Sequence, residues 1–149
     1  MQSSRPYILT YVVFVGLLAL ASIAVSIRLR PTRHSSVAFT AAIFPALLML
    51  ASFYSLAIHL HYHLGGWPTG IGDNGFPRAL IVHEQFSEFY FIILMLGTIF
   101  VWPVIYVLCA AIRRWRVCLY YLGVYALSFL LCSGAMLLAP RPFWDWWLD

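Results

Sequence analysis

The chain has 149 residues, of which 63% are hydrophobic and 9% are charged, with a formal net charge of +4. Soluble domains carry about a quarter charged residues, so this composition excludes an ordinary soluble protein and predicts an all-α membrane protein. At about 20 residues per membrane-spanning helix, four helices and their loops fill positions 1–149 as a single membrane domain, without a separate soluble domain.

Four apolar runs predict membrane-spanning helices at about 6–27, 37–58, 80–112 and 117–139. The first run is longer than a signal-peptide core and is followed at once by arginines, so we interpret it as a retained helix. Pro45 and Pro103 lie inside the second and third runs and should kink them, which membrane helices tolerate. Together the runs predict a four-transmembrane-helix bundle.

Arginines set the expected orientation. The chain has no lysine, and six of its nine arginines fall in two short loops, as Arg28, Arg30, Arg33, Arg113, Arg114 and Arg116. The positive-inside rule places both loops in the cytoplasm, so the chain should be N-out and C-out. All five acidic residues then lie on the other side, and we expect a multi-pass protein of a bacterial inner (plasma) membrane.

The connection between the second and third runs, residues 60–78, is the longest and is rich in glycine and proline. It should form a structured loop outside the cytoplasm. It lacks the lysine and the spacing of a phosphate-binding loop, and arginines beside apolar runs are topology signals, so we expect neither a nucleotide nor a nucleic acid as partner.

Tryptophans provide the candidate contact surfaces. Residues 140–149 should form a short interfacial segment after the fourth helix, because tryptophan favours the headgroup level. Aromatic clusters also form binding hot spots, so a partner-docking surface is the alternative. The interface candidates are Trp67, Trp144, Trp146 and Trp147.

Histidines and glutamates gather where the second run ends and the third begins. The candidate metal ligands are His59, His63, His83, Glu84 and Glu88. Imidazole and carboxylate groups suit zinc, iron or copper, and a b-type haem between two histidines or proton handling are alternatives. The simplest expectation is that these side chains bind water, lipid and loop backbone, and that Glu84 or Glu88 pairs with Arg78 or a histidine.

The backbone state decides which histidines lie together. In a helix His59 and His63 share a face, whereas in an extended segment His61 joins them on one side.

Small residues and cysteines complete the picture. Two sets of small residues should let helices pack closely, within the bundle rather than between copies: Gly16, Ala19, Ser22 and Ala24 in the first run, and Gly123, Ala126, Gly134 and Ala135 in the fourth. No disulfide framework exists, and Cys109 and Cys118 should lie reduced near the cytoplasmic end.

No catalytic motif such as a nucleophile elbow or H-E-x-x-H occurs, so we do not expect an enzyme. The leading hypothesis is a non-catalytic accessory or scaffolding subunit of a membrane complex, without a cofactor, whose partners are the bilayer and other subunits. The alternative is a redox, metal or haem protein with a His/Glu site on the outer face. A further alternative is a small-molecule carrier kinked at its two prolines.

Overall fold

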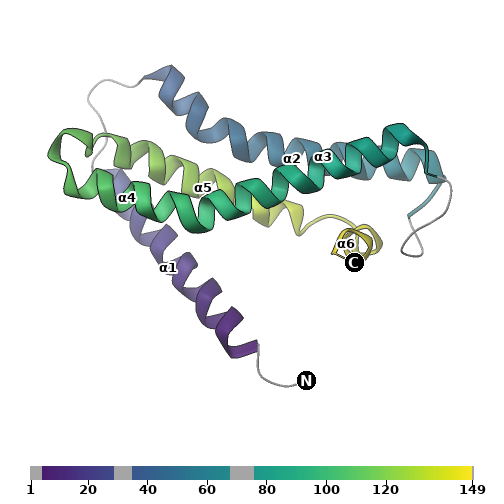
Figure 1. The fold of residues 1–149 in the computed structure, drawn as a ribbon, viewed down its shortest axis with the longest axis horizontal. Coiled ribbons are helices and arrows are strands. Elements are labelled where there is room, and N and C mark those ends of the chain that lie inside the picture. Colours follow the sequence, from purple (N-terminus) through teal and green to yellow (C-terminus); the bar gives the residue numbers. More distant parts are fainter. Residues whose placement is uncertain (1–4, 29–34, 68–75, 149) are drawn as a thin grey trace.

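The computed structural model describes residues 5–28, 35–67 and 76–148, and all regular structure within these ranges is helical (Figure 1). The elements, in chain order, are α1 (Arg5–Arg28), α2 (Ser36–Leu64), α3 (Arg78–Leu96), the π turn η1 (Gly97–Val101), α4 (Trp102–Ala111), the 3-10 turn η2 (Arg113–Trp115), α5 (Cys118–Met136) and α6 (Arg141–Leu148). The elements α3, η1 and α4 form one continuous rod. This rod is antiparallel to both α2 and α5 (Figure 1).

Three helical segments are long and apolar enough to cross a bilayer: Ser36–Leu64, Arg78–Ala111 and Cys118–Met136. This supports the expected all-α membrane class. In α1, the apolar stretch within the described residues is Ala19–Arg28, which is shorter than a membrane span. We call the end with Arg28 and η2 the arginine end, and the end with Leu64, Arg78 and α6 the histidine end.

The second helix is longer than its apolar run. Ser35 caps its start by accepting a hydrogen bond from the Ala38 N–H at 3.3 Å, and Gly65 ends it with φ 66°. That left-handed conformation suits glycine, which has no Cβ to clash. Because α2 continues to Leu64, residues 60–64 are helix rather than loop, and the extended arrangement of the three histidines does not occur. The rest of the expected outer loop, 68–75, lies outside the described residues.

The third run folds as one continuous rod, Arg78–Ala111, with a wider turn at η1. Proline lacks the N–H of a normal helical bond and crowds the preceding turn. Pro103 lies just after η1, and the Trp102 N–H bonds five residues back to the Gly97 carbonyl. A single π turn therefore absorbs the proline without ending the helix.

α5 lies between α1 and α2 and packs closely against both. Against α1, Gly123 faces Ser26, whose hydroxyl donates to the Leu119 carbonyl at 2.8 Å. A Cβ at Gly123 would overlap the Ser26 side chain, so this glycine is required for the close approach. Ala19, Ser22 and Ala126 are buried at the same contact, whereas Ala24 and Gly134 from the predicted sets are exposed.

The main core lies toward the histidine end, where α6 folds back onto the bundle (Figure 1). Phe143 of α6 has no exposed surface and its ring lies 5.0 Å from that of Phe53 in α2, centroid to centroid. The Trp144 indole N–H donates to the Met136 carbonyl at 2.7 Å, which ties α6 to the end of α5. The C-terminal segment is thus a helix that caps the core.

Candidate functional site

A histidine pair lies where the histidine ends of α2 and α3 meet. The Nδ1 atoms of His59 and His83 are 3.1 Å apart, and the two ring centroids are 5.4 Å apart. Deeper along the same helix pair, the Ser87 hydroxyl donates to the Ser52 carbonyl at 3.3 Å. The Tyr90 hydroxyl donates to the Pro45 carbonyl at 3.0 Å. These bonds fix the register of α3 on α2 and so bring His83 to His59.

Ser55 determines how the His83 ring is protonated. Its hydroxyl donates to the Ser52 carbonyl at 3.0 Å and lies 3.0 Å from His83 Nε2. Since a hydroxyl has one hydrogen, Ser55 must accept the second bond, and His83 Nε2 carries the proton. In its neutral form His83 then has its lone pair on Nδ1, directed at His59.

The neutral pair therefore has one consistent arrangement. His59 holds its proton on Nδ1 and donates it to the Nδ1 lone pair of His83 across the 3.1 Å contact. A proton on both facing nitrogens would place two N–H donors against each other and would leave His83 positively charged.

The same separation suits two ligands of one metal ion. Nitrogens that bind a tetrahedral ion at about 2.0–2.1 Å lie roughly 3.3–3.4 Å from each other. The two facing nitrogens are close to this spacing at 3.1 Å. His59 would only have to move its proton from Nδ1 to Nε2, and Ser55 would hold the outer nitrogen of His83, as metal-binding histidines commonly require.

A haem fits this contact less well. Two axial ligands of one haem iron lie on opposite faces of the macrocycle, and the direct contact between His59 and His83 leaves no space for one between them. The geometry of the histidine pair therefore favours a single metal ion over a haem.

The other candidate ligands do not join the pair. His61 packs its ring on Trp67, with centroids 4.5 Å apart, while His63 is exposed. Within the described residues, no group of three His, Cys, Asp or Glu side chains is placed to hold one ion. The expected ion pair is also missing from this part of the chain, where neither Glu84 nor Glu88 contacts Arg78 or a histidine.

The four candidate interface tryptophans are partly used inside the molecule. Trp67, Trp144, Trp146 and Trp147 all pack against the main core. The ring of Trp147, for example, lies 5.3 Å from that of Phe53 and edge-on to it. These side chains therefore stabilise the cap, and only their remaining surface is open to a partner.

Two of the three cysteines lie at the arginine end. Cys109, near the end of α4, and Cys118, at the start of α5, are both at the arginine end, and all three cysteines are free thiols.

Two residues important to this end of the molecule were not singled out from the sequence. Ser55 lies four residues before His59, so helical spacing alone would have placed it on the same face. Phe143 follows Pro142 and precedes Trp144, and no sequence feature marks it as a core residue.

Comparisons with protein-family models, with curated proteins and with solved structures found no match. The proposals below therefore depend on the geometry and chemistry of this chain.

Proposed function

We propose that this chain crosses a bacterial inner membrane four times, with both termini outside, and acts as a non-catalytic accessory subunit of a membrane complex. Besides the three long apolar segments, α1 would be the remaining span. Its 24 residues would measure about 36 Å, enough for a hydrocarbon core of about 30 Å. The arginine end would then face the cytoplasm and the histidine end the outside.

One observation supports a partner: the described residues cover very little of the rod Arg78–Ala111. Only 6% of the most apolar stretch of this rod is buried, against 39% for α2. At 34 residues the rod is about 51 Å long, so it extends well beyond the hydrocarbon. It therefore presents an apolar face through the bilayer and a polar face beyond it.

Unpaired carboxylates indicate what the partner supplies. Glu84 and Glu88 lie one helical turn apart, and no cation contacts them within the described residues. Carboxylates close to hydrocarbon are usually paired, because leaving them exposed there is costly. We infer that a transmembrane helix of another subunit lies along the rod, with a basic side chain near these carboxylates.

Site-specific photo-crosslinking tests this function. A photoreactive residue at Phe100 or Val104, which are 65% and 58% exposed on the rod, should form adducts with one discrete protein in intact membranes. The matched control is Leu47 on α2, which is 51% exposed and should give lipid adducts only. Replacing Glu84 and Glu88 by glutamine should weaken the protein adduct from the rod positions.

Two results would overturn the accessory role. One is lipid adducts alone at Phe100 and Val104, and the other is an adduct pattern that is the same at Leu47. The first would show that the rod faces bulk lipid, and the second that crosslinking is not specific to the rod.

A second candidate function, metal binding on the outer face, is favoured by the 3.1 Å contact of His59 with His83. Zinc or copper would be held by the two Nδ1 atoms, with the remaining positions taken by water or by a substrate. Elemental analysis of the protein purified without chelators should then find metal, and H83A should lose it. Equal metal content in both proteins would refute this second function.

A further inference from the structure

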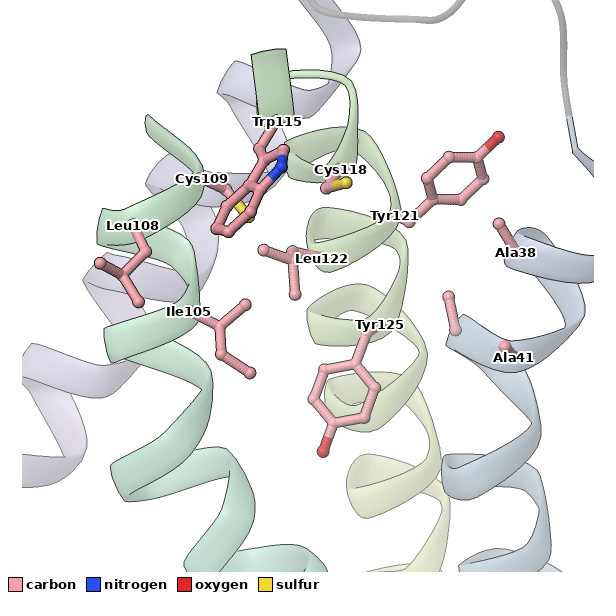
Figure 2. A pocket seen from close by; sticks show the side chains of 11 residues that line it. Ala38, Ala41, Ile105, Leu108, Cys109, Trp115, Cys118, Tyr121, Leu122 and Tyr125 are labelled. Atoms are coloured by element: carbon pink, nitrogen blue, oxygen red, sulfur yellow. The ribbon is translucent and has the colours of Figure 1, made fainter. Parts of the chain in front are cut away.

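A groove lies at the arginine end, between α2 and α4, with α5 as its floor (Figure 2). Its volume is about 590 Å³. Ala38 and Ala41 of α2 form one wall and Ile105 and Leu108 of α4 form the other, while Leu122 and Tyr125 rise from the floor. These walls are almost entirely hydrocarbon, so the groove suits an apolar chain.

The groove exists because the rod is bonded to α2 along its first half and to α5 along its second half. Its first half is bonded to α2 through Tyr90 and the Pro45 carbonyl. Beyond η1 it is bonded to α5 instead, since the Trp102 indole N–H donates to the Leu122 carbonyl at 3.1 Å. α4 therefore diverges from α2 toward the arginine end (Figure 1).

Tyr125, which lies at the end of the groove far from Trp115, is held by a hydrogen bond. The Thr98 and Tyr125 hydroxyls lie 2.5 Å apart, and the Tyr125 ring points down the groove from the floor (Figure 2). The bond fixes the Tyr125 ring as part of the groove floor.

The open end differs in chemistry from the walls. Trp115 lies across it (Figure 2), and its indole N–H makes no hydrogen bond within the described residues. The Tyr121 hydroxyl accepts a bond from the Ser35 backbone N–H at 3.0 Å, which leaves its own proton to donate. Two hydrogen-bond donors thus stand beside the entrance.

Three arginines surround Trp115 in sequence. Arg113 and Arg114 lie in η2 with Trp115, are exposed, and have no acid as partner among the described residues. Arg116 bonds the Ala110 carbonyl through Nε at 3.4 Å, which leaves its terminal nitrogens available. The segment that carries Trp115 to the groove therefore also carries three arginines, which are its close neighbours in sequence.

We propose that this groove binds one anionic glycerophospholipid, with an acyl chain between α2 and α4 and its phosphate beside the arginines of η2. Basic residues at an opening between membrane helices have the charge that such headgroups require. The apolar walls match the acyl chain, and the two donors at the entrance match the ester and phosphate oxygens.

Native mass spectrometry of the detergent-purified full chain, supplied with phosphatidylglycerol or phosphatidylcholine, tests the proposal. Phosphatidylglycerol should be retained in preference, as one adduct per chain. Replacing Arg113, Arg114 and Arg116 by glutamine should lower its affinity by about fivefold per arginine. R141Q, at the histidine end, is the matched control and should keep the preference.

A second variant tests the groove rather than the charge. A41F should fill it and reduce retention of both lipids, and circular dichroism checks that the helical content is unchanged. Glycerol 3-phosphate, which has the phosphate but no chain, should not be retained. The proposal is overturned by equal retention of both lipids, by a preference that survives loss of the three arginines, or by undiminished binding to A41F.

Discussion

His59 and His83 meet through their Nδ1 atoms at 3.1 Å, although 24 residues separate them in the sequence. The contact joins α2 to α3 at the end of the bundle where both helices leave their apolar runs. Ser55 fixes the protonation of one ring, and the contact fixes that of the other. The pair can therefore serve as a structural hydrogen bond or as two ligands of one ion. The effect of added zinc on the purified protein distinguishes these two roles.

Zinc should raise the Tm of the purified protein if the pair binds metal, because a ligand that binds only the folded state stabilises it. H59A and H83A should abolish the shift. S55A should weaken binding about 10- to 100-fold, because it removes the group that orients His83. Thermal unfolding followed by circular dichroism measures each effect.

His63 provides the control for the zinc experiment. It lies one turn beyond His59 but is exposed, so H63A should respond to zinc like the unmodified protein. A zinc-induced shift that persists in H59A would show that the ion binds elsewhere.

Gly123 should be the least replaceable small residue of the α1–α5 contact. G123A introduces a methyl group that would overlap Ser26 and lie 3.1 Å from the Ser22 carbonyl. Overpacking of this kind costs about 1–3 kcal/mol. Equilibrium unfolding in mixed micelles should show the loss.

Gly134 is the matched glycine in the same helix. Nothing lies within 4 Å of a Cβ placed there, so G134A should change the free energy of unfolding by less than about 0.5 kcal/mol. If G123A and G134A unfold alike, α1 does not pack against α5 as described.

The apolar runs predicted the existence of the long helices well, because runs of about 20 apolar residues have few alternative structures. Their ends were predicted less well. α2 continues past its apolar run because no helix breaker occurs before Gly65, and polar helical turns beyond the hydrocarbon leave no mark in hydropathy. The π turn before Pro103 was likewise expected only as a kink, since the local response to proline depends on the packing around it.

Phe143 should be essential for docking of α6, because it is completely buried between α6 and α2. F143A removes a large buried ring and should cost about 3–5 kcal/mol of the stability of this cap. Limited proteolysis with chymotrypsin should then cleave after Trp146 much faster than in the unmodified protein.

Asp145 is exposed in the same helix, so D145A should be cleaved no faster than the unmodified protein. Equal cleavage rates for F143A and the unmodified protein would show that α6 is not held by this side chain.

The candidate site was predicted in composition but not in arrangement. The sequence predicted that four histidines and two glutamates lie together where the second apolar run ends and the third begins. Which of them meet depends on how α2 and α3 are rotated against each other, and this rotation brings only His59 and His83 into contact. That rotation depends on distant contacts such as Tyr90 with the Pro45 carbonyl, which no local pattern encodes. The burial of the tryptophans against Phe53 has the same origin, since it requires α6 to fold back.

The proposed four-span topology underlies both the outer histidine pair and the inner lipid groove, and reporter fusions in a bacterial host test it most directly. Fusions after Arg33 and after Arg116 should be active only with a cytoplasmic reporter. Fusions after Gly72 and after Asp149 should be active only with a periplasmic reporter. A cytoplasmic signal after Gly72 or Asp149, or a periplasmic signal after Arg33 or Arg116, would contradict the topology.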